Sequence, residues 1–330
     1  LTTIPLIAFA VLSWFVPGVS GRFGMERTLF ASLILLICGF LLRSAPVFSA
    51  LFAGTVLIGV AIAAFNVLLP SLIKREFPQH FGVMTGVYTT SMTVCGAIAS
   101  GISVPLAAGL SLGWRLTLLC WSVLAVIAVI IWLPQLRRVR LSVDNRPAGM
   151  FKLLWRSALA WQVTLFMGMQ SFAFYVTITW LPEILENRGM DAAEAGWALS
   201  ILPFVSIPVT LIVPMLAGKF SGQRALAAAS ALFYLLGFSG LAWDGNNLLT
   251  ILWILCLGIG SGSSISLALA LIGMRAPNPH QAAALSGMAQ TVGYLLAAIG
   301  PTLFGLLHDV TNGWTLPLFT LIIAGVVQTV

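Results

Sequence analysis

The sequence predicts an all-α membrane protein made of two parallel halves of six helices, with eleven of those helices inside these 330 residues. Three observations support this: the composition, a series of long apolar runs, and a repeat that relates the two halves. Hydrophobic residues make up 59% of the chain and charged residues 8%, whereas soluble proteins carry roughly 25% charged residues. So few charges cannot cover a water-soluble surface, so most of the chain lies in lipid.

Eleven apolar runs have the length of a spanning helix. They cover residues 1–19, 28–44, 47–73, 82–109, 114–134, 158–182, 194–217, 224–243, 247–273, 282–307 and 313–330. One long polar interval, residues 135–156, interrupts the series and contains Arg137, Arg138, Arg140, Asp144, Arg146, Lys152 and Arg156. We therefore predict an N-terminal helical half over 1–134, a linker over 135–156, and a C-terminal half over 157–330.

The loops alternate in charge along the chain. One side, called the basic side below, holds thirteen of the sixteen Lys and Arg residues, including all those of the linker. The other, the acidic side, holds six of the nine acids: Glu183, Glu186, Asp191, Glu194, Asp244 and Asp309. Loops rich in Lys and Arg remain in the cytoplasm. We predict that the basic side and the linker are cytoplasmic.

The net charge of +7 does not indicate a nucleic-acid partner, because the basic residues are scattered between apolar runs and form no aromatic-rich basic face. The four cysteines lie in apolar runs without ligand spacing, and the three histidines lie near span ends without a second ligand. We predict no metal and no cofactor. The expected partners are the lipid bilayer and a small-molecule substrate, with the chain acting as a monomer.

A repeat relates the two halves. Val16-Pro17, Gly21-Arg22-Phe23 and Arg27 recur 197 residues later as Val213-Pro214, Gly218-Lys219-Phe220 and Arg224; Lys74, Pro78, Gly86 and Thr90 recur 201 residues later as Arg275, Pro279, Gly287 and Thr291. Ordered matches at nearly constant offset indicate duplication. The offset spans an even number of helices, so the halves are parallel, as in the major facilitator superfamily. The counterpart of 158–182 would precede Leu1, so we expect a twelfth helix there.

Three segments carry a closer resemblance. They are Leu1–Pro5 leading into Arg22–Arg27, Ala160–Phe166 with Trp180-Leu181-Pro182, and His280–Gln290 followed by Gly293-Tyr294. Together they resemble the cyanate and nitroimidazole transporter (CynX/NimT) branch of that superfamily. The resemblance implies a secondary transporter that moves a small planar or anionic solute, like 2-nitroimidazole or cyanate, by alternating access across the bacterial cytoplasmic membrane. It also implies an arginine in the first helix, which would precede this sequence.

No charged residue lies near the centre of a predicted span, so neutral polar and aromatic side chains have to line the cavity. The candidates for substrate binding are Gln170, Phe174, Tyr175, Gln290, Tyr294, Asn66 and Ser263. Amides and hydroxyls can donate to a cyanate or nitro oxygen, and aromatic rings can stack on a planar solute. The same groups could instead join helices through hydrogen bonds. The residue pattern leaves both alternatives open.

Ser263 belongs to a glycine-rich run, Gly258–Ser264, inside the span 247–273. No strand precedes the run, so it is not a dinucleotide-binding loop. Close helix packing through Gly258 and Gly262 is one interpretation. A locally opened helix that exposes Ser263 to the cavity is the other.

Four basic residues form the candidate gating set: Arg22, Arg27, Lys219 and Arg224. They occupy matching loops of the two halves, where they could latch one conformation or act only as topology signals. In the superfamily an acid usually precedes the first of these arginines. Here Gly21 takes that place, which argues against a gating salt bridge from this position.

A membrane enzyme would need a nucleophile, base or metal set at one depth, and the sequence has none. The alternative to a coupled carrier is a channel, or a uniporter for a different small metabolite without ion coupling. Facilitated diffusion, exchange and proton coupling remain open mechanisms.

Overall fold

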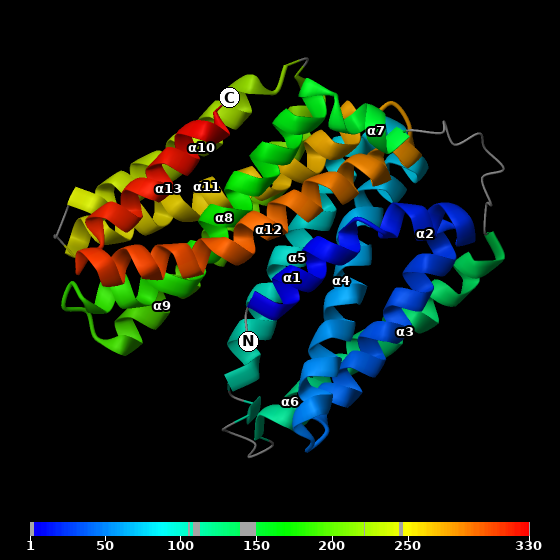
Figure 1. The fold of residues 1–330 in the computed structure, drawn as a ribbon, viewed down its shortest axis with the longest axis horizontal. Coiled ribbons are helices and arrows are strands. Elements are labelled where there is room, and N and C mark those ends of the chain that lie inside the picture. The colour runs from blue at the N-terminus through cyan, green and yellow to red at the C-terminus, as the bar shows by residue number, and fades with distance from the viewer. Residues whose placement is uncertain are drawn as a thin grey trace. The chain divides into compact units, whose positions relative to one another are not determined.

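The computed structural model describes residues 3–104, 106–107, 113–138, 150–220, 222–243 and 247–329 (Figure 1). Within these residues every regular element is helical. The longer helices are α3 (Met25–Ser44), α4 (Phe48–Glu76), α5 (Phe81–Val104), α6 (Gly113–Trp132), α8 (Ala158–Glu186), α9 (Ala192–Lys219), α10 (Arg224–Trp243), α11 (Asn247–Arg275) and α12 (Pro279–Thr311). The shorter ones are α1 (Thr3–Ser13), α2 (Val16–Phe23), η1 (Pro78–His80), η3 (Leu133–Arg138), α7 (Met150–Trp155) and α13 (Thr315–Gln328).

The predicted all-helical membrane fold is confirmed. In the described part of the chain nine helices are long and apolar enough to cross a membrane, and α1 with α2 makes a tenth if the bent pair is one span. The apolar helix α13 has 14 residues. Residues 139–149 of the predicted linker, with Arg140, Asp144 and Arg146, lie outside the described residues, as does Asp244.

The first predicted span, 1–19, is not one helix. It consists of α1 and α2, which meet at an angle of 52°. Pro17 occupies the first turn of α2, where the missing N–H of proline leaves no hydrogen bond unmade. An apolar run contains no sign of such a bend, so the expectation of a single helix was wrong here.

Helix α9 continues through three prolines, Pro203, Pro208 and Pro214. Each proline leaves the carbonyl four residues earlier without its intrahelical donor. Helices of this kind persist in lipid where a neighbouring side chain supplies the missing donor. The start of α9 is fixed by a capping box, in which the N–H of Glu194 donates to Asp191 at 2.7 Å and the N–H of Asp191 donates to Glu194 at 3.3 Å.

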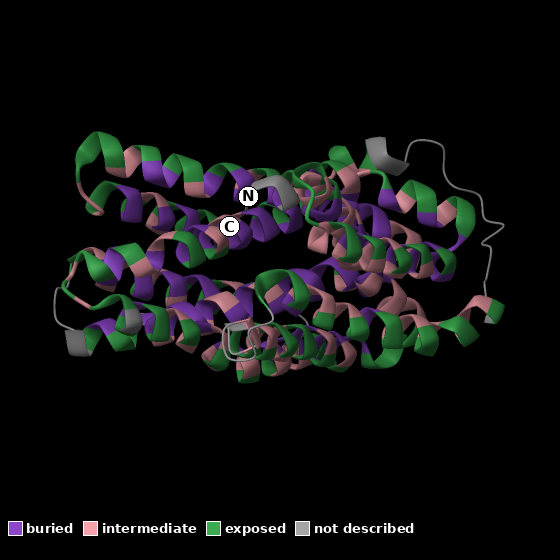
Figure 2. Cartoon of the chain, turned by 90° about the horizontal axis from the view of Figure 1, so that it is seen from below, coloured by how far each residue is buried: buried purple, intermediate pink, exposed green. Residues whose placement is uncertain are grey.

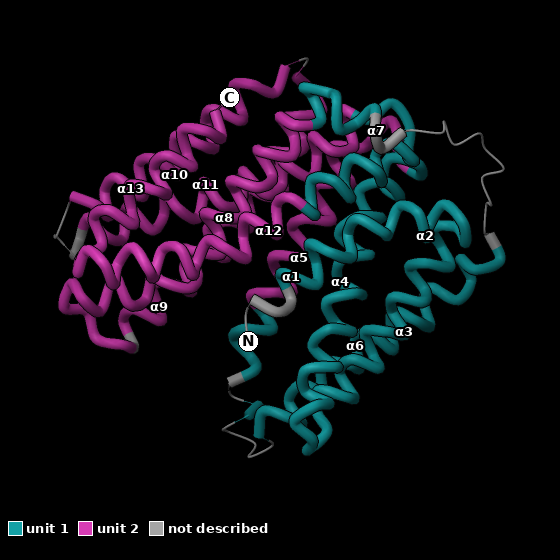
Figure 3. The backbone as a smooth tube through the Cα atoms, in the orientation of Figure 1, with its two compact units in different colours: residues 1–76, 98–160, 276–291 teal, residues 77–97, 161–275, 292–330 magenta. Residues whose placement is uncertain are grey.

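The described chain forms two compact units, coloured teal and magenta in Figure 3. Unit 1 contains residues 1–76, 98–160 and 276–291, and unit 2 contains residues 77–97, 161–275 and 292–330. Each unit therefore combines most of one sequence half with a segment from the other half. The start of α5 belongs to unit 2, and the start of α12 belongs to unit 1.

Each unit has its own apolar core, with its buried positions purple in Figure 2. In unit 2 the core joins α8, α9, α10, α11, α12 and α13, and its largest fully buried side chains include Tyr234, Phe238 and Phe304. In unit 1 a core cluster joins α2, α3 and α4 through Val16, Met25, Leu29, Ala64, Val67 and Leu68, with Ala283 of α12. Many large apolar side chains outside these cores are exposed, as expected for helix faces in contact with lipid.

Candidate functional site

Helices α8 and α12 approach each other closely in unit 2. A β-carbon built on Gly293 would lie 3.6 Å from the Cα of Gly168, and one built on Gly168 would lie 2.8 Å from a methyl group of Leu296. Small residues at a crossing allow two membrane helices to pack backbone to backbone. Near this crossing Tyr175 of α8 contacts Tyr294 of α12, two of the residues that the sequence singled out.

Gln170 lies two residues after Gly168 and is 3% exposed. Its amide nitrogen donates to the hydroxyl of Ser171 at 2.8 Å and lies 3.4 Å from the sulfur of Met167. Both partners belong to α8 itself. The hydrogen bonds of this amide therefore do not join α8 to another helix, which favours a role other than helix association.

Three aromatic rings from α8 and α12 contact one another. The ring centroids of Tyr175 and Tyr294 are 6.4 Å apart in an edge-to-face arrangement, which joins α8 to α12. Phe174 packs on Tyr175 at 5.3 Å, also edge-to-face. Tyr294 is buried, whereas the exposed fraction of Phe174 is 39%. On α8, therefore, the amide of Gln170 is buried and the ring of Phe174, one turn later, is partly exposed.

Gln290 lies one turn before Tyr294 on α12 and is 1% exposed. Its side-chain oxygen is buried and has no hydrogen-bond partner among the described residues. The hydroxyl of Thr291 is buried in the same way. Buried polar atoms without partners are rare in native proteins, so this segment of α12 can accept or donate hydrogen bonds to a ligand.

The glycine-rich run of α11 serves packing. Helix α11 is continuous over its 29 residues, so the alternative of a locally opened helix is not what the structure has. A β-carbon on Gly258 would lie 3.0 Å from Val205, and one on Gly262 would lie 2.9 Å from Ser206, both on α9. The hydroxyl of Ser263 donates to the carbonyls of Ile259 and Gly260 within its own helix. Its proposed contact with substrate stays a prediction.

Asn66 lies in α4, in unit 1, and is partly buried. Its backbone carbonyl accepts a hydrogen bond from the hydroxyl of Ser286 of α12 at 3.2 Å. The structure thus connects Asn66 with the same helix that carries Gln290. A role for the Asn66 side chain in binding also stays a prediction.

The four candidate gating residues, Arg22, Arg27, Lys219 and Arg224, are all exposed. The guanidinium of Arg22 lies 5.4 Å from the ring of Phe23. Glu26, the residue before Arg27, forms an ion pair with Arg75 at 2.6 Å. This pair joins the start of α3 to the end of α4. Its repeat counterpart joins Arg275 to the carbonyl oxygen of the Gln223 side chain, also at 2.6 Å.

These two contacts were missed at the sequence level, although a signal existed. Glu26 and Gln223 are 197 residues apart, which is an offset of the repeat, and Arg75 directly follows Lys74, the repeat counterpart of Arg275. In the first contact Arg75, the neighbour of the repeated Lys74, makes the ion pair, and in the second contact the repeated Arg275 itself donates.

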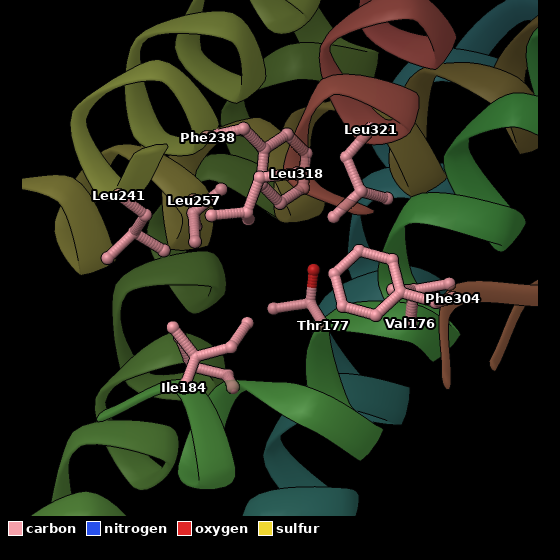
Figure 4. Close-up of a pocket in the computed structure, with 10 residues that line it drawn as sticks. Val176, Thr177, Ile184, Phe238, Leu241, Leu257, Phe304, Leu318 and Leu321 are labelled. Atoms are coloured by element: carbon pink, nitrogen blue, oxygen red, sulfur yellow. The ribbon is translucent and has the colours of Figure 1, made fainter. Parts of the chain in front are cut away.

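An apolar void in unit 2 is not a substrate site (Figure 4). It lies between α8, α10, α11, α12 and α13, and Thr177 is the polar residue among those that line it. The hydroxyl of Thr177 already donates to the carbonyl of Ala173 at 2.7 Å. The void holds about 10 Å³, which is roughly the room one water needs.

Comparison with known proteins assigns the chain to a family. The sequence profile of the Major Facilitator Superfamily matches residues 1–327. The chain belongs to this superfamily. A proton:xylose symporter of the superfamily, XylE, has the same fold, with a TM-score of 0.83 and 13% identity over 99% of this chain and 83% of that one.

Three curated relatives are transporters. The chain is 50% identical to the uncharacterized transporter YycB of Bacillus subtilis, over 99% of this chain and 81% of that protein. It is 43% identical to the 2-nitroimidazole transporter of Escherichia coli, over 96% of this chain and 80% of that protein. The cyanate transport protein CynX of the same organism is 26% identical, over 95% and 81%. The predicted superfamily and branch are confirmed, and this member is a multi-pass membrane transporter.

Proposed function

We propose that this major facilitator superfamily member is a secondary transporter of a small planar solute of the 2-nitroimidazole kind, working by alternating access in the bacterial cytoplasmic membrane. The observation that carries the proposal is the buried amide of Gln170 on α8, the helix whose Tyr175 contacts Tyr294 of α12, in a chain 43% identical to a 2-nitroimidazole transporter. The predicted positive-inside orientation places the basic side in the cytoplasm.

The chemistry of these two helices favours a neutral ring over a small anion. Neither α8 between residues 158 and 182 nor α12 between 282 and 307 contains a charged residue. An anion moved into these helices would meet amides, hydroxyls and aromatic rings only, and an unpaired charge in lipid is costly. A nitro group needs donors of this kind, and an imidazole ring can pack against tyrosines. Cyanate is the second candidate, because the relative CynX is a cyanate transport protein.

The experiment that tests the function is counterflow in proteoliposomes with labelled 2-nitroimidazole and, separately, cyanate. Saturable counterflow of 2-nitroimidazole is the expected result. Counterflow of cyanate without counterflow of 2-nitroimidazole would show that the substrate is a small anion and not a planar ring. Counterflow of neither probe, from protein shown to be folded, would contradict the proposed substrates. Repeating the assay with a pH gradient shows whether a proton moves with the solute.

Site assignment needs a separate comparison of two buried glutamines. Gln170 and Gln328 are both 3% exposed and both lie in unit 2, but Gln328 belongs to α13 and donates to Ser264 of α11 at 2.6 Å. Replacing Gln170 with Ala should weaken 2-nitroimidazole binding about ten-fold, the loss of roughly one good hydrogen bond. Replacing Gln328 with Ala should leave affinity unchanged. Equal affinities in the wild type and Gln170→Ala would remove this amide from the site.

A further inference from the structure

A close and polar helix crossing joins α5, from the first sequence half, to α9, from the second half, inside unit 2. A β-carbon on Gly82 would lie 2.5 Å from the carbonyl oxygen of Pro214, and one on Gly86 would lie 2.7 Å from that of Leu211. Real β-carbons do not approach oxygen so closely. Only glycine at these two positions permits the observed contact.

The crossing also supplies a hydrogen-bond donor that α9 lacks. Pro214 has no N–H, so the carbonyl of Thr210 lacks its donor within the helix. The hydroxyl of Thr89 lies 2.9 Å from that carbonyl oxygen, closer than from the carbonyls of Thr85 and Gly86 on its own helix. Thr89 and Thr210 are fully buried. A hydroxyl has one proton, and the carbonyl that lacks another donor gains most from it.

A second hydroxyl pair adds to the same contact. The side-chain oxygens of Thr90 and Thr210 are 3.2 Å apart. Phe81, one turn before Gly86 on the same helix, covers Gly273 of α11 with its ring. The contact of α5 with the second-half helices therefore combines glycines, threonines and one aromatic ring.

Unit 1 contains a crossing of the same design. There Gly287 of α12 faces α1 and α2, and a β-carbon on it would lie 2.9 Å from the carbonyl oxygen of Ser13 and 2.8 Å from the ring of Pro17. Pro17 follows Ser13 by four residues, as Pro214 follows Thr210. The repeat offsets of 197 and 201 relate these residues to Pro214 and Gly86. In both crossings a glycine of one half meets a backbone carbonyl of the other half, close to a proline.

The crossings differ from the cores in strength. The large buried side chains of the unit 2 core all come from the second sequence half, and those of the unit 1 cluster come from the first half, apart from Ala283. A cross-helix hydroxyl bond in a membrane changes an equilibrium by only about three-fold on average, and up to roughly 20-fold. Such a contact can open thermally without unfolding either core.

We propose that Thr89 and Pro214 form a latch that positions α5 against α9 and opens in each transport cycle. The crossing is in equilibrium between a closed state, which is the one in this structure, and an open state. Its link to transport rests on the proposed function. Thr89 acts here as a positioning residue, and substrate does not contact it.

The first test needs no substrate. A single cysteine replaces Thr210 in protein whose four native cysteines are changed to serine, and its alkylation rate in membranes reports opening of the crossing. Thr89→Val should raise this rate about three- to ten-fold. Thr93→Val is the matched control, because that hydroxyl donates at 3.0 Å to the Thr89 carbonyl of its own helix, and it should change little. Lys219→Cys, at the exposed end of α9, gives the rate of an open position.

A double variant isolates the proline. Pro214→Ala restores the N–H that serves the Thr210 carbonyl, so Thr89→Val should have little further effect in that background. A thiol at position 210 that stays unreactive in every variant, while the thiol at 219 reacts, would overturn the latch. The latch would also be overturned if Thr89→Val changed the alkylation rate at position 210 equally in the presence of Pro214 and in the Pro214→Ala background.

The second test connects opening to transport. Cysteines at positions 90 and 210 replace hydroxyls that are 3.2 Å apart and should form a disulfide on oxidation. The reduced pair should support 2-nitroimidazole counterflow, oxidation should abolish it, and reduction should restore it, whereas each single cysteine should be insensitive. Undiminished counterflow in fully cross-linked protein would refute the latch. Absence of counterflow in wild-type protein would contradict the proposed function, and the alkylation test would still decide the latch.

Discussion

At the scale of single residues, Gln223 and Gln290 show two different states of a buried glutamine. The amide nitrogen of Gln223 donates to the carbonyls of Ala217 and Phe220, and its oxygen accepts from Arg275. Gln290 is buried more deeply, yet its oxygen has no partner among the described residues. A buried polar atom without a partner costs about 1–3 kcal/mol. A binding site can carry that cost, because the ligand supplies the missing donor.

Replacing Gln290 with Leu should therefore separate stability from binding. The variant loses an unsatisfied polar atom, so its unfolding temperature should rise by a few degrees, while its affinity for 2-nitroimidazole should fall about ten-fold. Thermal unfolding in detergent and equilibrium binding measure the two quantities. Gln223→Leu is the control and should do the reverse, with lower stability and unchanged affinity. A Gln290→Leu variant that binds as well as the wild type would exclude this residue from the site.

Sequence could single out the polar candidates for the site but not their hydrogen bonds. Gln170, Gln290 and the two tyrosines stand out because they interrupt apolar runs. Whether such a residue is satisfied depends on side chains that come from elsewhere in the chain. Ser263 looks equally exceptional in sequence, yet its hydroxyl bonds to its own helix. Tertiary neighbours separate these cases, and periodicity does not.

At the scale of helices, two contacts on the basic side anchor neighbouring elements in matching ways. Glu26 and Arg75 join α3 to α4, with side chains 5% and 20% exposed. Gln223 and Arg275 join the start of α10 to the end of α11. The second contact uses an amide where the first uses a carboxylate. The reason is local, because the amide nitrogen of Gln223 holds two carbonyls near the end of α9.

Exchanging the two side chains should destabilise both contacts. Glu26→Gln replaces a charge-assisted hydrogen bond with a neutral one and should cost about 1 kcal/mol. Gln223→Glu gains an ion pair with Arg275 but turns a carboxylate oxygen toward the carbonyls of Ala217 and Phe220, so it should also lower the unfolding temperature. Thermal unfolding of the two single variants is the measurement. A more stable Gln223→Glu protein would show that the amide donors contribute little.

Two glycines of α12 should respond differently to the same substitution. A β-carbon on Gly293 meets nothing closer than 3.5 Å, so Gly293→Ala should keep or raise stability through its higher helix propensity. A β-carbon on Gly287 would lie 2.9 Å from the backbone oxygen of Ser13, so Gly287→Ala should lower the unfolding temperature. Equal effects of the two substitutions would mean that the crossing at Gly287 is looser than described.

Helix positions were largely predictable from hydropathy, and helix ends were less so. The predicted span 224–243 coincides with α10. Helix α8 continues to Glu186, past the predicted end at Pro182, since a proline removes one donor without ending a helix whose other bonds remain. The bend between α1 and α2 was invisible, because both sides of it are apolar. Helix ends depend on capping residues and prolines. Hydropathy averaged over a window of residues does not detect them.

At the scale of the whole molecule, the repeat has structural meaning beyond the matching loops. Its offsets relate Glu26 to Gln223 and also the two glycine crossings, in which each half contributes the glycine once and the proline-containing partner once. Such exchanged roles are typical of a duplicated transporter. The predicted division at the linker, into 1–134, 135–156 and 157–330, remains our proposal for the parts that move during transport.

The central claim is that a carrier uses Gln170 and the tyrosines of α8 and α12 to move a planar solute. Equilibrium exchange of labelled 2-nitroimidazole in proteoliposomes, measured across a range of concentrations for wild type and Gln170→Ala, tests it most directly. The account predicts saturable exchange by the wild type and a half-saturating concentration about ten-fold higher in the variant. Exchange that rises linearly with concentration, as through a channel, or the same half-saturating concentration in both proteins, would contradict it.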